Sequence, residues 1–242
     1  MTRKEAQPVS NLPATAREAL AIAEASGGWL QKRLDLYSRY SKSFHPELHE
    51  AYEELIRRLA APKNAGPLAG AVMPDFVLPD HNGKLIRLAS LIADGPVVLS
   101  LNRGHWCPWC RLELRALAQI NSEVVGLGGQ VVSIVPETLS YSQRMVEDNN
   151  LPFKVLTDLD LGYALSLGLV IWAGERVREH YLRGGIDLSL FQNNKGWFLP
   201  IPATFIIGYR GEVVARFVNP DFRARMEPTE ILAALGSAAR AR

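Results

Sequence analysis

Apolar residues near the start of the chain recur at the spacing of an amphipathic helix. Steps of three and four residues separate Leu30, Leu34, Tyr37, Tyr40 and Phe44. The same spacing resumes after Pro46, and residues spaced in this way share one face of a helix. The pattern therefore predicts helices that are broken near Pro46, and we interpret residues 1–62 as an N-terminal helical extension.

The pattern of apolar and polar residues changes after a segment that is rich in Ala, Gly and Pro. We interpret that segment, residues 63–74, as a linker. Beyond it, apolar runs such as "PVVLSLN" and "GQVVSIVP" alternate with stretches of helical pattern, and continuous runs of this length are typical of buried strands. The alternation predicts that residues 75–242 form one α/β domain, in which helices cover a central sheet with parallel strand pairs.

Two turn signals add antiparallel hairpins to this domain. Asn82-Gly83 stands between two strand-like runs, and Asn-Gly is a favoured hairpin turn. The later run "ATFIIGYRGEVVARFV", residues 203–218, has a Tyr-Arg-Gly turn between two further strand-like runs. Residues 182–200 precede it and are predicted as a long loop. Such a loop could cap a site, bind a substrate or cover the edge of the sheet.

The composition is ordinary for a globular protein and narrows the choice of partners. Hydrophobic residues make up 48% of the 242 residues and charged residues make up 21%. The formal net charge of +2 gives no strong basic field, so we expect neither a nucleic acid nor a membrane as a partner. No apolar run approaches the roughly 20 residues that span a bilayer, and the first residues lack the apolar stretch of a signal peptide. We therefore expect a cytoplasmic protein.

The chain contains two cysteines, three residues apart in "NRGHWCPWCRLEL". A buried strand is predicted to end just before this stretch, and Pro108 suits the first turn of a helix. Cys107 then lies at the helix N-terminus, where unpaired N–H groups and the helix dipole lower the pKa of a thiol. Cys110 lies one turn further on the same side, and Arg103 and Arg111 can add positive charge. The pair can therefore form a reversible disulfide and act as a redox centre.

Other interpretations of these residues remain open. A close cysteine pair in a reducing compartment is more often catalytic or metal-binding than a structural disulfide. A zinc site needs two further ligands, and His105 stands too close for a familiar zinc motif, so we predict neither a metal nor another cofactor. The two cysteines could also be inert core residues. Trp106 and Trp109 either form an apolar rim or pack in the core, and Arg103 pairs either with a thiolate or peroxide or with a surface carboxylate.

The stretch "RGHWCPWCRLEL", preceded by "GPVVLSLN" and followed by "PATFII", resembles the peroxiredoxin-like branch of the alkyl hydroperoxide reductase and thiol-specific antioxidant family. The resemblance covers residues 72–228. It implies a thioredoxin-like three-layer fold with a central mixed sheet. It also implies a thiol-dependent antioxidant oxidoreductase that reduces peroxides through Cys107 and Cys110, with Arg103, Trp106 and Pro108 in support. An external dithiol, thioredoxin-like or of glutathione type, would regenerate the thiols, and a homodimer is one arrangement that the resemblance allows.

The sequence departs from the family pattern at the peroxide site. In the usual pattern a threonine and a proline precede the attacking cysteine, and reading back from Cys110 these positions hold Cys107 and Arg103. The family's activating arginine is replaced at Ile201-Pro202, and Pro202 resembles the proline that thioredoxins hold in the cis form opposite their active site. We therefore predict a cis peptide bond there. The alternatives are a thiol–disulfide oxidoreductase without peroxidase activity and a redox-regulated binding protein. The helix terminus favours Cys107 as the first nucleophile, whereas the family pattern favours Cys110.

Overall fold

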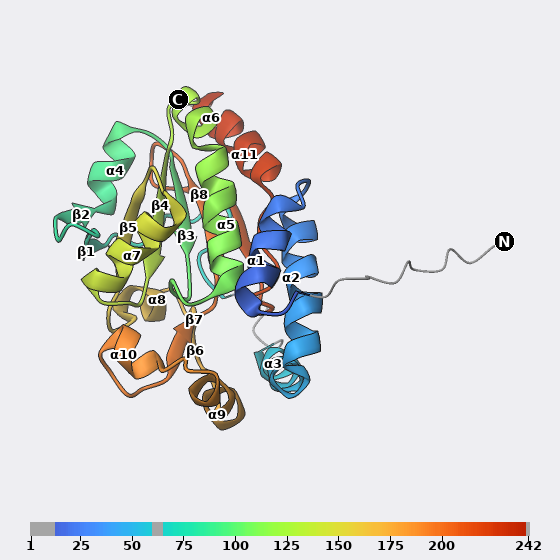
Figure 1. Cartoon of the computed structure of the whole chain (residues 1–242). Coiled ribbons are helices and arrows are strands. Elements are labelled where there is room, and N and C mark those ends of the chain that lie inside the picture. Colours follow the sequence, from blue (N-terminus) through green and yellow to red (C-terminus); the bar gives the residue numbers. More distant parts are fainter. Residues whose placement is uncertain (1–12, 60–64, 241–242) are drawn as a thin grey trace.

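The structure is a computed structural model that describes residues 13–59 and 65–240. Parts of the predicted extension and linker, at residues 1–12 and 60–64, lie outside the described residues. At the centre of the described chain is a five-stranded sheet with the order β5-β4-β3-β8-β9 (Figure 1). Its strands are β3 (Val97–Leu101), β4 (Gln130–Val135), β5 (Lys154–Thr157), β8 (Ala203–Ile207) and β9 (Val213–Val218).

The directions of these strands make the sheet a mixed one, as predicted. Strands β3, β4 and β5 run parallel, whereas β8 pairs antiparallel with both β3 and β9. Each of the two apolar runs quoted above contains one of the parallel strands. The later hairpin is confirmed as β8 and β9. Because β8 pairs with β3, this hairpin lies next to the central strand of the sheet.

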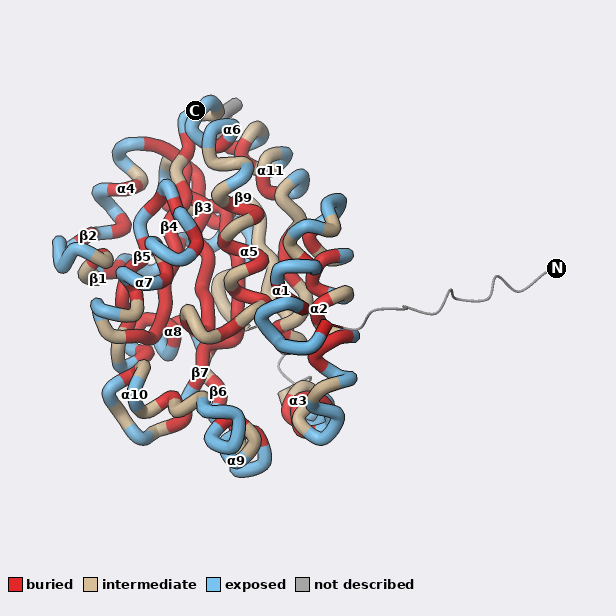
Figure 2. Tube along the Cα trace, viewed as in Figure 1, coloured by how far each residue is buried: buried red, intermediate tan, exposed pale blue. Residues whose placement is uncertain are grey.

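Both faces of the sheet are covered, because successive side chains of a strand point to opposite faces. Val98 and Ile206 belong to one core cluster and Leu99 and Phe205 to another. Helices that pack around Val98 are α5 (Pro108–Gln119), α6 (Asn121–Gly126), α7 (Leu139–Asn149) and α11 (Pro228–Arg240). Figure 2 shows the resulting buried sheet with exposed residues on the outer sides of the helices.

Smaller elements surround the second face. The hairpin predicted at Asn82-Gly83 is present, and Gly83 has a φ of 81°. It joins β1 (Val77–Pro79) to β2 (Leu85–Arg87), and α4 (Leu88–Asp94) and α8 (Gly162–Ser166) complete this side. Residues 182–200, predicted as a loop, contain the end of α9, all of α10 and β7, and β7 pairs with the earlier strand β6. These elements are β6 (Val170–Trp172), α9 (Glu175–Arg183), α10 (Leu188–Gln192) and β7 (Phe198–Pro200).

The helices predicted on either side of Pro46 are present as α2 (Leu30–Phe44) and α3 (Pro46–Leu59). A further helix, α1 (Ala16–Ala25), precedes them. Trp109 of α5 donates a hydrogen bond from its indole N–H to Ser38 of α2, at 2.9 Å. Leu30 and Leu34 of α2 are buried in the same core cluster as Leu99 of the sheet. One core cluster therefore joins the N-terminal helices to the sheet. The division into an extension at residues 1–62 and a redox domain at residues 75–242 stays a prediction.

Polar contacts also fix the N-terminal helices and the described part of the linker. The backbone N–H groups of Leu30 and Gln31, at the start of α2, donate to the Glu227 carboxylate at 2.9 and 2.7 Å. A carboxylate at a helix N-terminus is stabilised by the helix dipole. Residues 65–74 lie along β9, where the Gly70 N–H donates to the Val213 carbonyl at 2.8 Å. Within the described ranges, no helix is long and apolar enough to cross a membrane.

Candidate active site

The cysteine turn connects the end of β3 to the start of α5. Cys107 is the N-cap of α5, with φ −88° and ψ 111°, and Pro108 occupies the first turn as predicted. Gly104 has a φ of 135°, and a Cβ there would lie 2.6 Å from both the Glu137 carboxylate and the indole nitrogen of Trp106. The turn therefore requires glycine at this position. The Glu137 carboxylate also accepts a hydrogen bond from the His105 backbone N–H at 2.8 Å.

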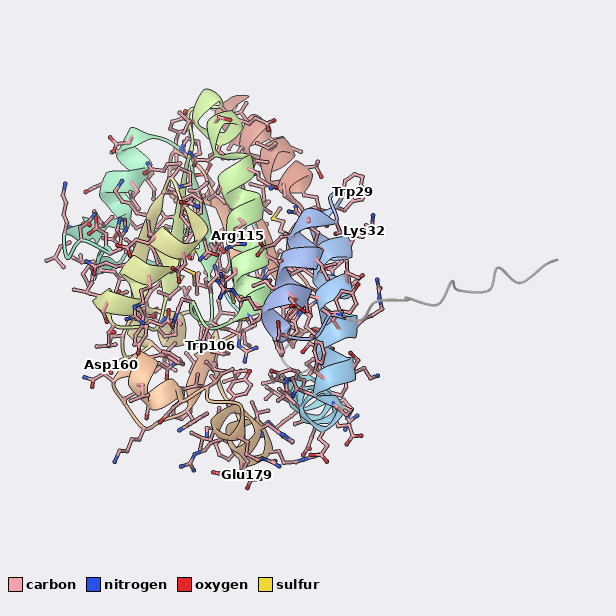
Figure 3. The ribbon with its side chains drawn as sticks, in the orientation of Figure 1. Trp29, Lys32, Trp106, Arg115, Asp160 and Glu179 are labelled. Carbon is pink, nitrogen blue, oxygen red and sulfur yellow. The ribbon has the colours of Figure 1, made fainter. Side chains whose placement is uncertain are left out.

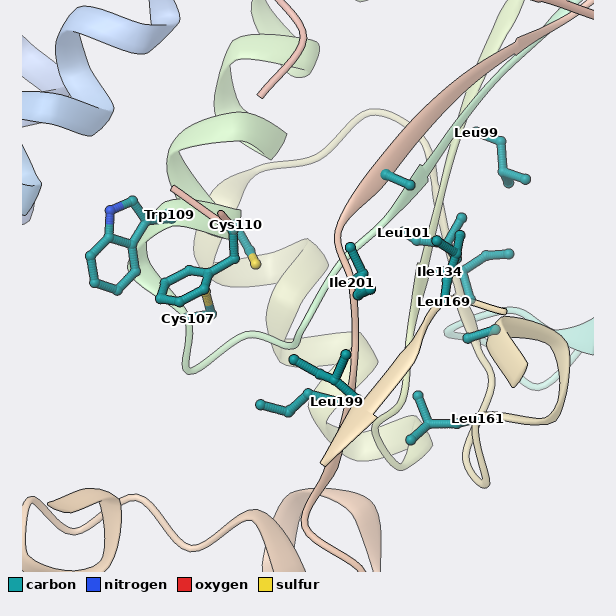
Figure 4. Close-up of a cluster of buried hydrophobic side chains, with 14 of the residues drawn as sticks. Leu99, Leu101, Cys107, Trp109, Cys110, Ile134, Leu161, Leu169, Leu199 and Ile201 are labelled. Carbon is teal, nitrogen blue, oxygen red and sulfur yellow. The ribbon is translucent and has the colours of Figure 1, made fainter. Parts of the chain in front are cut away.

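Both cysteines are reduced, fully buried and close to each other. A hydrogen bond joins the Cys107 and Cys110 thiols. The Cys110 sulfur also accepts from the Arg103 backbone N–H at 3.4 Å and from a guanidinium N–H of Arg225 at 3.5 Å. Figure 4 shows the two cysteines at the start of α5, beside Trp109, with the labelled apolar side chains of the sheet to their right. The fold therefore brings the two predicted redox cysteines together.

Their surroundings give the two thiols different acidities. Burial by itself raises the pKa of Cys107, but the hydrogen bond from Cys110 and the charges of Arg103 and Arg225 outweigh it. Together they lower the pKa of Cys107 to about 6. Burial and the neighbouring Cys107 raise the pKa of Cys110 well above its usual range. Cys107 is therefore the more acidic thiol of the pair, and Cys110 is the one that keeps its proton.

Arg103, a predicted supporting residue, is buried in the site and makes no surface salt bridge. Only 1% of the residue is exposed. One guanidinium nitrogen, Nη2, donates to the hydroxyl of Tyr181 at 2.6 Å, and the guanidinium lies 4.0 Å from the Phe222 ring centre and 5.1 Å from that of Trp106. In the described part of the chain, its Nε and Nη1 atoms have no hydrogen-bond partner. Arg103 thus keeps free donors beside the buried thiolate.

A second buried arginine, which could not be identified from the sequence, lies close to the thiols. Arg225 follows β9 and is 4% exposed. Its Nε lies 2.6 Å from a carboxylate oxygen of Glu113, one turn beyond Cys110. The other oxygen of Glu113 accepts from the Ser100 and Thr204 hydroxyls at 2.9 and 3.2 Å. A fully buried ion pair with these hydrogen bonds holds Arg225 at Cys110.

The tryptophans of the turn occupy different surroundings. Trp109 is 3% exposed and contacts Tyr37, Tyr52 and Phe222 edge-on, with ring centres 5.0, 6.0 and 5.2 Å apart. It is therefore a packing residue. Trp106 is half-buried and lines the cavity beside the turn, and its role as an apolar rim stays a prediction. In the described residues its indole N–H has no partner.

His105 is anchored to a buried carboxylate. Its Nδ1 lies 3.0 Å from Glu137, and its ring stacks on Tyr141 with ring centres 4.9 Å apart. Burial raises the pKa of Glu137, and the contacts with His105 act against that rise. Arg111, expected near the thiols, donates instead to Asn149 at 3.2 Å.

The predicted cis bond at Pro202 is absent. The described residues contain no cis peptide bond, so the Ile201-Pro202 bond is trans and the prediction was wrong. The Ile201 N–H donates to the Leu169 carbonyl at 2.8 Å, and the chain continues in extended form from β7 into β8. A trans bond fits the extended chain at residues 198–207, because a cis bond would shorten the chain and turn it. A supporting role of Pro202 at the site stays a prediction.

A cavity of about 390 Å³ opens beside the cysteine turn. Its lining includes Trp106, Pro108 and Trp109, which come from the cysteine turn and the start of α5. The wall opposite them comes from α2, α3 and α9 and includes Tyr52 and Tyr181, whose hydroxyls are 3.1 Å apart. The N-terminal helices therefore form part of the site, which the sequence did not indicate. In the part of the chain that the structure describes, no group of three or more His, Cys, Asp or Glu side chains could hold a metal ion.

Comparisons with known proteins agree with this geometry. The family model described as AhpC/TSA family matches residues 69–216, which is more than half of the chain. A curated protein of Mycobacterium tuberculosis, provisionally named a peroxiredoxin, is 27% identical over 100 residues. That match covers 41% of this chain and 65% of the relative, slightly less than two thirds of the relative's length.

Solved structures show the same fold. Peroxidoxin BcpB from Mycobacterium tuberculosis is 22% identical, with a TM-score of 0.54, and the match covers 70% of this chain and 96% of that one. A mutant of peroxiredoxin 6 from Arenicola marina is 20% identical, with a TM-score of 0.57, and the match covers 71% of this chain and 73% of that one. The predicted thioredoxin-like fold is confirmed. The family match begins after α3, so the N-terminal helices lie outside it.

Proposed function

Because the chain belongs to the AhpC/TSA family, we propose that it is a thiol-dependent peroxidase that works through Cys107 and Cys110. The observation that carries the proposal is the asymmetry of the pair. Cys107 has a pKa of about 6 and lies beside unpartnered donors of Arg103, whereas Cys110 keeps its proton. One sulfur is thus ready to attack and the other is ready to resolve.

In the proposed first step, the Cys107 thiolate attacks the terminal oxygen of a hydroperoxide. An S–O bond forms and the O–O bond breaks, so the sulfur is oxidised to a sulfenic acid and the peroxide is reduced to an alkoxide, which takes a proton from water. Negative charge moves to the leaving oxygen in this step. Donors that are already in place for such charge lower the barrier, and the free Nε and Nη1 atoms of Arg103 are suited to that role.

In the second step, the sulfur of Cys110 displaces the hydroxyl from the sulfenic acid of Cys107. A disulfide forms and the Cys110 proton leaves with the hydroxyl as water. Arg225 contacts the Cys110 sulfur and stabilises the thiolate that must form there. An external dithiol then reduces the disulfide by exchange and is itself oxidised to a disulfide. We propose a thioredoxin-like or glutathione-type donor, since a yeast mitochondrial 1-Cys peroxiredoxin of similar fold is resolved through glutathione and thioredoxin systems.

A thiol–disulfide oxidoreductase without peroxidase activity is the second candidate. One observation favours it: the acidic thiol belongs to Cys107, at the first position of the pair, whereas the family pattern aligns the attacking cysteine with Cys110. In this alternative the Cys107 thiolate attacks a disulfide of a partner, and Cys110 releases the mixed disulfide.

The test is peroxide consumption by the purified full chain, with dithiothreitol or a thioredoxin system as reductant. We expect turnover of hydrogen peroxide or an alkyl hydroperoxide, none with Cys107→Ser, and a stable sulfenic acid on Cys107 in Cys110→Ser. Reduction of insulin disulfides without peroxide turnover would support the second candidate. If neither activity is present, a redox-regulated binding protein becomes the better interpretation.

A further inference from the structure

Both thiols are closed off from solvent in this structure. Cys107 and Cys110 are each 0% exposed, and neither residue lines the cavity beside the cysteine turn. Any reaction with a molecule from outside, whether a peroxide, a disulfide or a dithiol, therefore needs part of the cover over Cys107 to move. The element of this cover that is held least firmly is the one expected to move.

The cover is built from aromatic side chains. Tyr37 comes from α2 and Tyr52 from α3, and the negative charge of Cys107 contributes to the raised pKa of both, in agreement with their position near its sulfur. Trp109 packs edge-on against both tyrosine rings. Phe222 packs against Trp109 and Tyr52, with 5.2 and 4.9 Å between ring centres. The N-terminal helices thus supply half of this aromatic group.

Helix α9 completes the cover. Its Tyr181 packs against Trp106, with ring centres 5.3 Å apart, and accepts a hydrogen bond from Tyr52. Figure 3 shows Trp106 between the start of α5 and α9, with Glu179 on the outer side of α9. Helix α3 lies beside α9 at the lower end of α2 (Figure 1), so it joins the two other helices of the cover.

Two parts of the cover are firmly attached. The start of α2 is held by two backbone hydrogen bonds to Glu227, and Ser38 further along α2 accepts from Trp109. The cysteine turn is anchored on the fully buried Glu137 carboxylate, which accepts from the backbone N–H of His105. Displacement of α2 or of the turn would break hydrogen bonds that are partly buried, and it would leave their donors and acceptors unpaired.

Helix α3, by contrast, is tied to the rest of the chain mostly at its surface. In two ion pairs the glutamate side chain, Glu53 or Glu54, is more than half exposed, and exposed ion pairs contribute little to stability. The hydrogen bond of Arg58 is exposed as well. These contacts are Glu53–Arg223, Glu54–Arg176 and Arg58 to the Trp172 carbonyl, at 2.8, 2.8 and 2.6 Å.

The packing around α3 is also incomplete. A cavity of about 230 Å³ lies between α3 and the segment from β6 to α9, and Ala51 and Leu55 of α3 line it. The cavity of about 390 Å³ borders the same helix at Leu48 and Tyr52. Side chains that line a void lack contacts on that side, so a displacement of α3 breaks fewer contacts than a displacement of a fully packed helix.

The junction of α2 and α3 has the form of a hinge. Helix α2 ends at Phe44, and His45 has a φ of −135° and a ψ of 64°, outside the helical region. Pro46 has no N–H group, so the hydrogen bonding of one helix does not continue into the next. The first turn of α3 stays joined to α2 through the buried contact of His49 with Ser41, at 3.0 Å. A rotation of α3 about this end moves Tyr52 away from the thiols.

We propose that α3 is a hinged lid over the thiol pair, which swings away from α9 about His45 and opens a path to Cys107. In the closed form the lid shields the thiols from reagents in solvent. In the open form the Cys107 thiolate meets its substrate, and the disulfide meets its reductant. The inference requires only that Cys107 reacts with a molecule from solvent, so it applies equally to a peroxidase and to a thiol–disulfide oxidoreductase.

The test is the alkylation of Cys107 by iodoacetamide in the full chain with Cys110→Ser, followed by mass spectrometry of the Cys107 peptide. The midpoint of the rate against pH gives the pKa of Cys107, and the plateau above the midpoint gives the access of the reagent. We expect a plateau far below that of a short peptide with the same sequence around Cys107. Glu53→Gln together with Glu54→Gln should raise the plateau about two- to tenfold and leave the midpoint unchanged, since an exposed ion pair changes an equilibrium constant by up to about fivefold.

Arg87→Gln is the matched control, because it removes an exposed ion pair with Asp75 that is not a contact of α3. It should leave the plateau unchanged. Urea below the unfolding transition separates lid opening from global unfolding: a local opening exposes little surface, so the plateau should change little with urea.

Four results would overturn the inference. They are a plateau equal to that of the peptide, an equal increase in the double variant and in Arg87→Gln, a plateau that rises with urea as steeply as global unfolding, and an increase with Glu137→Gln but none with the α3 variant. The last result would show that the cysteine turn opens instead of the lid.

Discussion

Replacement of Arg103 by Met should raise the pKa of Cys107. The Arg103 charge is one of the contributions that lower this pKa to about 6, and the side chain is buried, so water cannot screen its charge. An opposite charge at close range typically lowers a pKa by about 1–3 units, each unit being about 1.4 kcal/mol. We therefore expect the pKa of Cys107 in Arg103→Met to lie about 1–3 units higher. Its thiolate fraction at pH 7 would fall accordingly.

The assay is the rate of alkylation of Cys107 by iodoacetamide as a function of pH, in a Cys110→Ser background that removes the second thiol. The Cys110→Ser chain is the reference for every variant, because loss of the Cys110 hydrogen bond itself shifts the pKa of Cys107. Because only the thiolate reacts, the rate should rise with pH through the pKa, and the midpoint should move to higher pH in Arg103→Met. Arg103→Lys keeps the positive charge and should keep the midpoint closer to that of the unsubstituted chain. Far-UV circular dichroism and a thermal melt establish that each variant is folded. A folded Arg103→Met protein with an unchanged midpoint would refute the assignment of Arg103 as the stabilising charge.

Three further predictions concern the turn and the N-terminal helices. Mild oxidation should remove two hydrogens from the peptide that contains Cys107 and Cys110, as mass spectrometry would show; two stable free thiols would contradict the redox pair. Gly104→Ala should lower the free energy of unfolding by at least about 1–3 kcal/mol, because a φ of 135° and a close approach to Glu137 both oppose a Cβ; an unchanged denaturation midpoint would contradict this. A chain beginning at Gly70 should still melt cooperatively, at a lower temperature because the contacts of Trp109 with α2 and α3 are lost; a chain that only aggregates would contradict an independent redox domain.

The central strands β3, β4 and β8 could be predicted because each is a short, mainly apolar run that is buried along almost its whole length, so no alternation is needed. The start of α5 was equally accessible, since Pro108 marks a first turn and places Cys107 at its end. The hairpin of β6 and β7 was missed. Its strands have three residues each and are separated by two short helices, so neither has a period long enough to be recognised.

The charged residues around the thiols were harder to predict for a different reason. Arg103 could be named because it is a neighbour of the pair, but its complete burial depends on Tyr181 and Phe222, which are far away in the sequence. In the sequence, most strands of the main sheet lie between Glu113 and Arg225. Each of these two residues, taken by itself, has the sequence pattern of an ordinary surface residue. The cis-proline prediction failed because it was taken from a likeness between families, whereas the path of the chain is set locally by the pairing of β7 with β6.

The position of the N-terminal helices divides the site into two parts with different origins. The cysteine turn, Arg103 and the sheet up to residue 216 lie within the family match, whereas Tyr37 and Tyr52 come from helices outside it. Yet Tyr52 donates to Tyr181, and Tyr181 accepts from Arg103, so a chain of hydrogen bonds links α3 to the charge that lowers the pKa of Cys107. Because buried hydrogen bonds of this kind hold their members in place, the N-terminal helices help to position Arg103 as well as lining the cavity beside the cysteine turn. We therefore expect the reaction type to follow from the family core, and the choice of substrate to follow from the helices that this chain adds to it.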